Sequence, residues 1–316
     1  YRHAIKYLEI AHGISPQYLS VIYDLGYFYE RLNKYNRSIS CYEKYLDIDP
    51  FSENVWYNLG VAYFKLNQPQ KAIEAYDYSL ALNPDYASAY FNKANTFSSL
   101  GEYDKAINTI NDFLEVEPDN SQALMFLGDC YEQTNEFRKA LEVYKKIIET
   151  DNTDADGWFG AGMVLYQMNR YDEASIYMLK ALEFDSQNTD YWINLGFIYE
   201  EAGNSDEAIK CFRQVVRTDP TDIEGWLSLS SLMLETGHLD NAIVVLREAI
   251  TRFPEDEQVA VRLAECHLKM GNQRAGIKFL EVALRNNPVV LSDFKKGYPQ
   301  EKWDEKLKAV IEKYTK

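Results

Sequence analysis

A fixed spacing of 34 residues runs through most of this chain and constrains its fold more than any other feature. Trp56 and Trp192 stand 136 residues apart, four times that spacing, and Leu-Gly follows three residues after each of them. A period of this length indicates an array in which one supersecondary unit is stacked many times. Seven of the nine prolines keep the spacing or a multiple of it, at positions 16, 50, 84, 118, 220, 254 and 288.

Three positions of the repeat hold residues of one kind in all eight units, which begin at residues 19, 53, 87, 121, 155, 189, 223 and 257. Positions 8 and 20 hold only Gly, Ala or Ser, which let two helices cross closely. Position 15 holds only Asn or Gly, which accept the left-handed conformation that ends a helix. Each unit is therefore predicted to contain helix A at positions 2–14, a tight turn, and helix B at about positions 18–30.

The repeat divides the chain into three predicted parts. Residues 1–18 fit the second half (helix B) of a preceding repeat, residues 19–290 form eight contiguous units, and residues 291–316 form a capping segment and helix. The last helix has an apolar side with Trp303 and Leu307 and a polar opposite side, as the end of a solenoid requires. Because residues 1–18 lack their helix A, Ile5 and Leu8 should be only partly covered. We expect either further repeat sequence before Tyr1, so a truncated N-terminus, or self-association through residues 1–18.

The motif Trp-x-x-Leu-Gly-x-x-Tyr carries a family resemblance. It stands at residues 56–63 and 192–199, and Ala, an aromatic residue and Pro follow it within the same 34-residue period. This pattern resembles the tetratricopeptide repeat (TPR) family. The resemblance implies an all-α, right-handed superhelical solenoid of helix-turn-helix repeats. His267 departs from the pattern, since it replaces the aromatic residue of position 11, and indicates local repacking.

Composition and motifs exclude several classes of function. The net charge of −16 argues against nucleic acid as a partner, which would need clustered Lys and Arg. No apolar run reaches the roughly 18 residues of a membrane span. The four cysteines lie four or five repeats apart in matching positions, so we expect free thiols and a reducing compartment such as the cytoplasm. No spacing typical of catalytic residues, a cofactor or a metal is present, so we predict no enzyme activity, no cofactor and no metal.

The A helices carry the surface that the TPR resemblance implies for ligand binding, a concave groove that takes an extended peptide. Positions 2, 5, 6, 9 and 12 together hold nine acids, nine aromatic residues and one base, Arg262. This composition predicts a ligand with basic and apolar side chains, although the acids could also be ordinary solvated surface. The basic residues that some family members use to clamp an acidic tail are absent, since position 5 holds no Lys.

Asparagines at position 6 add a possible backbone contact, because a side-chain amide both donates to and accepts from an extended peptide. Asn58, Asn92 and Asn194 resemble part of the asparagine ladder of peptide-binding TPR proteins. The predicted groove residues are Tyr23, Tyr27, Tyr57, Asn58, Phe91, Asn92, Asn95, Phe126, Asp129, Phe159, Asp190, Asn194 and Phe197.

The sequence thus predicts a non-catalytic scaffold that binds an unidentified protein or peptide in its groove. The alternative is that the chain is the recognition arm of a larger multidomain enzyme or of a secretion or assembly machine. The full-length sequence separates the two, since the alternative requires flanking catalytic or membrane segments.

Overall fold

The computed structural model describes residues 1–315, and all regular structure in that range is helical. Within those residues no helix has both the length and the apolar character to cross a membrane. The A helices are α2 (Leu19–Arg31), α4 (Glu53–Lys65), α6 (Ala87–Ser99), α8 (Ser121–Gln133), α10 (Ala155–Gln167), α12 (Thr189–Glu201), α14 (Ile223–Glu235) and α16 (Glu257–Lys269). The B helices are α1 (Arg2–Ile14), α3 (Tyr35–Ile48), α5 (Pro69–Leu82), α7 (Tyr103–Val116), α9 (Phe137–Thr150), α11 (Tyr171–Phe184), α13 (Ser205–Thr218), α15 (Leu239–Arg252) and α17 (Gln273–Asn286).

The helices follow the sequence period closely. Each A helix begins 34 residues after the previous one and occupies positions 1–13, one residue earlier than predicted. Each B helix from α3 onward occupies positions 17–30. The predicted all-α helical repeat is therefore confirmed, while the division into a half-repeat (1–18), eight units (19–290) and a capping segment (291–316) stays a prediction.

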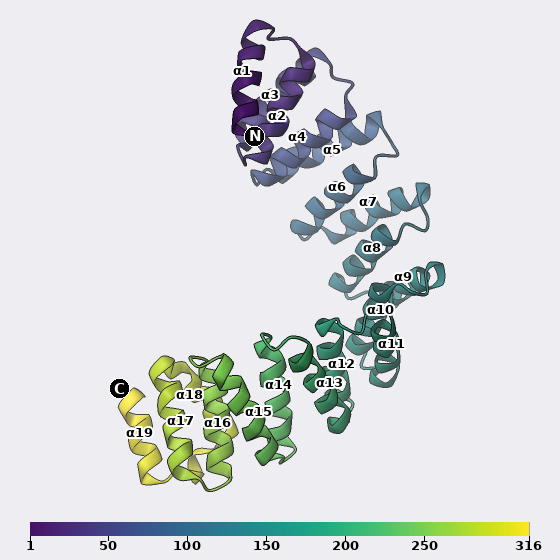
Figure 1. Ribbon diagram of the computed structural model, residues 1–316. Coiled ribbons are helices and arrows are strands. Elements are labelled where there is room, and N and C mark those ends of the chain that lie inside the picture. Colours follow the sequence, from purple (N-terminus) through teal and green to yellow (C-terminus); the bar gives the residue numbers. More distant parts are fainter. Residues whose placement is uncertain (316) are drawn as a thin grey trace. The chain divides into compact units, whose positions relative to one another are not determined.

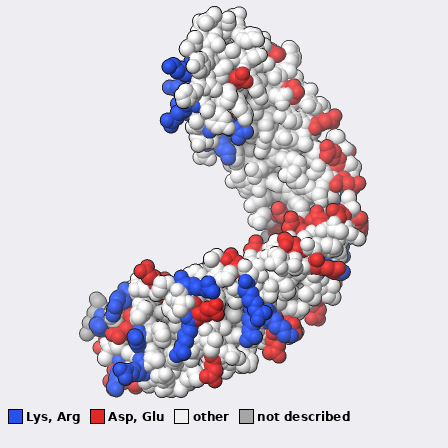
Figure 2. Space-filling view, in the orientation of Figure 1, with Lys and Arg blue, Asp and Glu red and all other residues white. Residues whose placement is uncertain are grey.

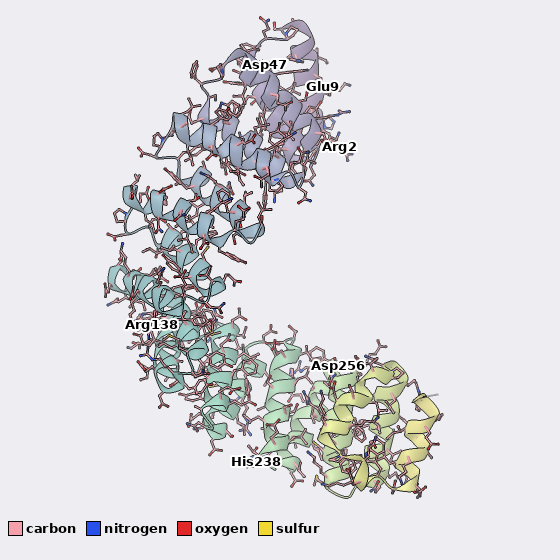
Figure 3. All side chains as sticks on the ribbon, turned by 180° about the vertical axis from the view of Figure 1, so that it is seen from behind. Arg2, Glu9, Asp47, Arg138, His238 and Asp256 are labelled. Carbon is pink, nitrogen blue, oxygen red and sulfur yellow. The ribbon has the colours of Figure 1, made fainter. Side chains whose placement is uncertain are left out.

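The chain forms two compact units, residues Tyr1–Val164 (unit 1) and Leu165–Lys316 (unit 2). In unit 1, each helix from α1 to α8 contacts the next helix along the chain, and in unit 2 the same holds from α11 to α16 (Figure 1). The short turns and the longer loops lie at opposite ends of the helices, as His238 before α15 and Asp256 before α16 show for unit 2 (Figure 3). The stacking of helix pairs in each unit is that of a helical repeat.

Left-handed backbone ends every A helix in the same way. All eight residues at position 15 have positive φ, between 56° and 59° for the four asparagines and between 73° and 80° for the four glycines. Asn and Gly tolerate this region better than other residues. The predicted role of position 15 as the turn between the helices is confirmed.

Glycine at position 8 allows an aromatic ring to lie directly against the backbone of the A helix. A Cβ atom placed on Gly196 would stand 2.4 Å from Cε1 of Phe212, and one on Gly60 would stand 2.5 Å from Cε1 of Tyr76. In three repeats where position 24 is aliphatic, position 8 is larger than glycine, as in the pair Ala94 and Ile110. The close crossing predicted from the small residues is therefore a contact between the position-8 backbone and the position-24 side chain.

The first and last helices are covered to different degrees. Ile5 of α1 is buried against α2, which is more cover than the sequence predicted. Tyr7, Ile10 and Ile14 are the exposed apolar residues of α1, and self-association through this helix stays a prediction. At the other end, η1 (Pro288–Val290), α18 (Leu291–Gly297) and α19 (Glu305–Thr315) contact α16 or α17, and the exposed η2 (Gln300–Lys302) lies between α18 and α19 in the chain.

The C-terminal cap buries one acid. Glu265 of α16 is only 6% exposed, because Gly297 of α18 lies so close that a Cβ there would stand 2.3 Å from its carboxylate. Burial raises the pKa of Glu265 to about 7, although Lys269 and Arg262 act in the opposite direction. Glu235, Asp293 and Lys296 line the same polar cavity.

The four cysteines of the chain are free thiols, as expected from their positions, and Cys130, Cys211 and Cys266 are buried.

We predict that Gly196→Ala lowers the free energy of unfolding by roughly 1–3 kcal/mol, because the added methyl group overlaps the ring of Phe212. Phe212→Leu alone should also destabilise the chain, because it leaves a cavity. The double variant should lose less than the sum of the two, since Ala opposite a branched aliphatic residue already occurs in the repeat with Ala94 and Ile110. Denaturant melts of the three variants measure this coupling, and additive losses would show that the two residues do not pack on each other.

We predict a pH-dependent stability that depends on Glu265. Its folded pKa of about 7 lies above the ordinary value of 4.5. Between these pH values the folded chain holds a proton that the unfolded chain has released, so the free energy of unfolding falls as pH rises through this window. Relative to wild type, Glu265→Gln should gain on the order of 2–3 kcal/mol from pH 4.5 to pH 8.

Chemical denaturation at several pH values measures the effect of Glu265, and the exposed substitution Glu301→Gln is the control. Parallel curves for wild type and Glu265→Gln would mean that the carboxyl group titrates normally in the folded chain.

Candidate functional site

The predicted groove residues all lie on one surface of the A helices, formed by positions 2, 5, 6, 9 and 12, which we name the A-helix face. The structure divides them between the two units, with Asp190, Asn194 and Phe197 in unit 2. The other ten lie in unit 1 and are Tyr23, Tyr27, Tyr57, Asn58, Phe91, Asn92, Asn95, Phe126, Asp129 and Phe159. The predicted residues therefore form two groups, one in each unit.

Two asparagines of unit 1 bond to tyrosines of the preceding repeat. The Nδ2 atom of Asn58 donates to the hydroxyl of Tyr23 at 3.2 Å, and Nδ2 of Asn92 donates to the hydroxyl of Tyr57 at 2.7 Å. Both bonds join residues 35 positions apart, from position 6 of one repeat to position 5 of the one before. These amides therefore link adjacent A helices, a role that the sequence did not predict.

The aromatic residues of the face are half-buried, and Tyr57 and Phe91 show how they pack on rings outside the face. Tyr57 lies 6.1 Å from Tyr76 and 5.1 Å from Tyr86 between ring centroids. Phe91 meets Phe113 edge to face at 5.4 Å. Each ring thus presents one side to the core and leaves the other at the surface.

Acids at position 12 accept hydrogen bonds from tyrosines at position 24 of the same repeat. The hydroxyl of Tyr42 lies 3.3 Å from Oε2 of Glu30, and the hydroxyl of Tyr144 lies 2.7 Å from Oε1 of Glu132. Burial raises the pKa of Glu30, and the bond from Tyr42 opposes this rise. These two acids are therefore held in place by core side chains and are not simply solvated surface.

Tyr144 joins two acids of the face. Its hydroxyl also lies 2.8 Å from Oδ1 of Asp129, so two carboxyl groups share one phenol. Desolvation raises the pKa of Asp129, and its bond to Tyr144 lowers it. Burial and both carboxylates raise the pKa of Tyr144 far above its ordinary value, which keeps its proton in place as a donor.

Tyr144 was missed from sequence, although its position carries a signal. Its ring lies between two helices, since a Cβ on Gly128 of α8 or on Gly160 of α10 would stand 2.6 Å or 2.7 Å from ring atoms. Gly160 interrupts the asparagines of position 6 for this reason, because any side chain there would strike the ring. In this pair of repeats the glycines at positions 8 and 6 leave room for the ring at position 24 between them.

The three predicted residues of unit 2 make different contacts. The Nδ2 atom of Asn194 donates to the backbone oxygen of Asp190 on its own helix at 2.7 Å. The matching residue of the preceding repeat is Phe159, which has no hydroxyl to accept such a bond. Phe197 packs edge to face on Phe212 at 5.3 Å. Asn194 is thus not arranged as Asn58 and Asn92 are.

Basic and acidic residues gather on different parts of the surface of unit 1. In the view of Figure 2, Lys and Arg gather beside α1, whereas Asp and Glu follow the edge at the ends of α5, α7 and α9. Among the described side chains, no group of three or more His, Cys, Asp or Glu is placed to hold a metal ion. The groups that the A-helix face offers to a ligand are carboxylates, amides and aromatic rings.

Several solved structures are similar to part of this chain. The structure titled "Functional Characterization of Pseudomonas Aeruginosa pilF" is 20% identical, covers 69% of this chain and 97% of its own, and has a TM-score of 0.51. MamA is 20% identical over 54% of this chain and 94% of its own, with a TM-score of 0.48. YrrB, titled a TPR protein with an unusual peptide-binding site, is 21% identical over 58% of this chain and 95% of its own, with a TM-score of 0.47. No curated protein sequence matches this chain.

Three family descriptions match the sequence. "Tetratricopeptide repeat" matches residues 53–86, and "TPR repeat" matches residues 26–67. "Cilia and flagella-associated protein 70 C-terminal domain" matches residues 86–295, about two thirds of the chain. Repeats of this kind generally serve as non-catalytic scaffolds that bind proteins. The chain belongs to the TPR family described as the Cilia and flagella-associated protein 70 C-terminal domain.

Proposed function

We propose that the A-helix face of unit 1 binds an extended protein segment with basic and apolar side chains, and that the chain acts as a non-catalytic interaction scaffold. The observation that carries this proposal is the arrangement of acids among half-buried rings. Glu30, Asp129 and Glu132 are each held by a tyrosine hydroxyl, so their positions are fixed before a ligand binds. Preorganised groups lose less entropy on binding.

The charge of the face favours a basic segment. A carboxylate that accepts one bond from tyrosine still has acceptor sites for Lys or Arg. Such attraction mainly raises the association rate and the selectivity for basic partners. The rings at Tyr57, Phe91 and Phe126 supply apolar area beside the acids, and their faces also attract cations.

The asparagines support contacts with the peptide backbone. Asn58 and Asn92 each use one N–H to bond tyrosine. Each amide keeps a second N–H and a carbonyl oxygen, which match the acceptor and donor of an extended peptide. Asn58 and Asn92 would then be two rungs on neighbouring helices, and Asn95 lies one helical turn beyond Asn92 on α6.

The alternative function, the recognition arm of a larger assembly, draws support from the family. The matching family is described as the C-terminal domain of a cilia- and flagella-associated protein. We propose that the chain recruits a protein partner within such an assembly. In such an assembly the chain would still act as a scaffold, and the same residues of the A-helix face would bind the partner.

The test starts from a display library of extended peptides selected on the intact chain, followed by calorimetry with the enriched peptides. We expect Lys, Arg and apolar residues to be enriched. Asn58→Ala with Asn92→Ala should weaken binding by about 1 kcal/mol for each amide. Tyr23→Phe with Tyr57→Phe should weaken binding less, because these changes free the same amides for the ligand.

Asn108→Ala with Asn111→Ala is the matched control, since both asparagines are exposed on the B helix α7. Raising the salt concentration above 0.1 M, where charges are screened within about 10 Å, should weaken binding of the basic peptides. Selection of acidic peptides, or equal affinities for the A-helix variant and the control, would contradict the proposal.

A further inference from the structure

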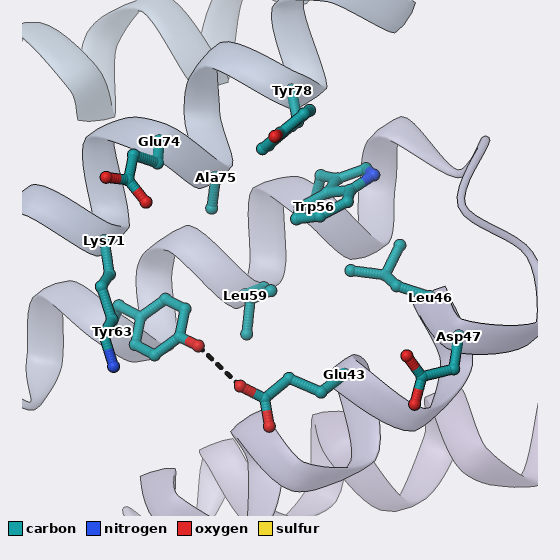
Figure 4. A pocket seen from close by; sticks show the side chains of 10 residues that line it. All are labelled: Glu43, Leu46, Asp47, Trp56, Leu59, Tyr63, Lys71, Glu74, Ala75 and Tyr78. Carbon is teal, nitrogen blue, oxygen red and sulfur yellow. Dashed lines mark hydrogen bonds between the residues drawn. The ribbon is translucent and has the colours of Figure 1, made fainter.

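A pocket of about 380 Å³ opens between α3, α4 and α5 in unit 1, away from the A-helix face (Figure 4). Its residues come from other repeat positions, namely 4, 7 and 11 of the A helix and several of the two B helices. The lining consists of Glu43, Leu46, Asp47, Trp56, Leu59, Tyr63, Lys71, Glu74, Ala75 and Tyr78.

The interior of the pocket is apolar and aromatic. Leu46, Leu59 and Ala75 are buried and form its base. Trp56 stacks on Tyr78 at 4.4 Å between ring centroids, although Tyr78 is 56% exposed. Such a surface accommodates an alkyl chain, and its aromatic faces attract a cation.

The rim of the pocket is mainly acidic. Glu43, Asp47 and Glu74 are exposed carboxylates, against the single ammonium group of Lys71. The hydroxyl of Tyr63 donates to Oε1 of Glu43 at 2.7 Å and fixes that carboxylate at the rim. Burial and the neighbouring Glu43 raise the pKa of Tyr63 to about 12, so it remains a donor. The ammonium group of Lys71 lies over the ring of Tyr63 on one side of Glu43. Asp47 lies on the other side of Glu43, away from Lys71 (Figure 4).

The next repeat fills the matching space with its own lysine. Lys93 stands at position 7, where repeat 2 has Leu59, and its Nζ pairs with Asp77 at 2.6 Å. Asp77 occupies the position of Glu43 in the preceding B helix. The same ammonium lies 6.0 Å from the ring of Phe97, which matches Tyr63.

This comparison of two repeats identifies the occupant. In repeat 3 a lysine reaches from position 7 to an acid on the preceding B helix, over an aromatic ring. In repeat 2 the acid and the ring are present, position 7 holds Leu59, and two further acids, Asp47 and Glu74, surround the space.

We propose that this pocket binds a lysine side chain of a partner protein, with its alkyl chain against Trp56 and Leu59 and its ammonium group beside Glu43 and Asp47. The partner's lysine takes the place that Lys93 occupies in the next repeat. The pocket is independent of the A-helix face, because the two surfaces share no residue.

The test uses the full chain labelled with 5-fluorotryptophan and followed by fluorine NMR. Trp56→Phe assigns the resonance of Trp56, and Trp192 and Trp226 are internal references because they occupy the same repeat position. The probes are the N-acetyl methylamides of lysine, arginine and norleucine. We expect the lysine probe to shift Trp56 saturably and to bind about fivefold more tightly than norleucine, which lacks the charge.

Charge variants locate the ammonium group. Glu43→Gln with Asp47→Asn should weaken binding of the lysine probe about fivefold, and both residues are exposed, so the fold should be kept. Glu115→Gln, at the same repeat position as Asp47 but two repeats later, is the matched control and should bind as wild type does. Tighter or equal binding of arginine or norleucine, no saturable shift of Trp56, or equal affinities for variant and control would overturn the proposal.

Discussion

The contact between a glycine at position 8 and a ring at position 24 sets the geometry on which the other features depend. Because Gly26, Gly60, Gly128 and Gly196 have no side chain, the rings of the B helix lie directly on the A-helix backbone. This contact fixes the separation of the two helices within a repeat. The repeats with Ile110 and Leu246 at position 24 carry Ala and Ser at position 8, so in these two repeats the total volume at the crossing stays close to that of a glycine with a ring.

The same rings connect the core to the A-helix face. In two repeats the tyrosine that packs on this glycine sends its hydroxyl to an acid of the face. Tyr42 reaches Glu30, and Tyr144 reaches Asp129 and Glu132. Phe212 and Ile110 fill the same position without a hydroxyl, so they provide no donor for an acid of the face. The identity of one core residue therefore decides whether an acid of the face has a fixed position.

The sequence alone predicted the period, the two helices of each repeat and the turn at position 15, because each depends on residue types at fixed spacing along one helix. It also placed the candidate residues on one surface of the A helices. It did not predict the bonds of Asn58 to Tyr23 and of Asn92 to Tyr57, or the position of Tyr144 between two helices. These contacts join different repeats, and spacing along the chain does not give the direction of each side chain. The pocket beside Trp56 was missed for the same reason, since its lining comes from three helices of two repeats.

The central claim is that core tyrosines control the acids of the A-helix face, and the pKa of Asp129 tests it most directly. Carbon-detected NMR titration can measure this pKa in wild type and in Tyr144→Phe, which keeps the ring and removes the hydroxyl. In wild type, desolvation raises the pKa of Asp129, and the bond from Tyr144 lowers it. The pKa of Asp129 should be still higher in the variant, because the substitution removes the hydrogen bond that lowers it and leaves the desolvation that raises it. An unchanged or lower pKa in Tyr144→Phe would contradict it.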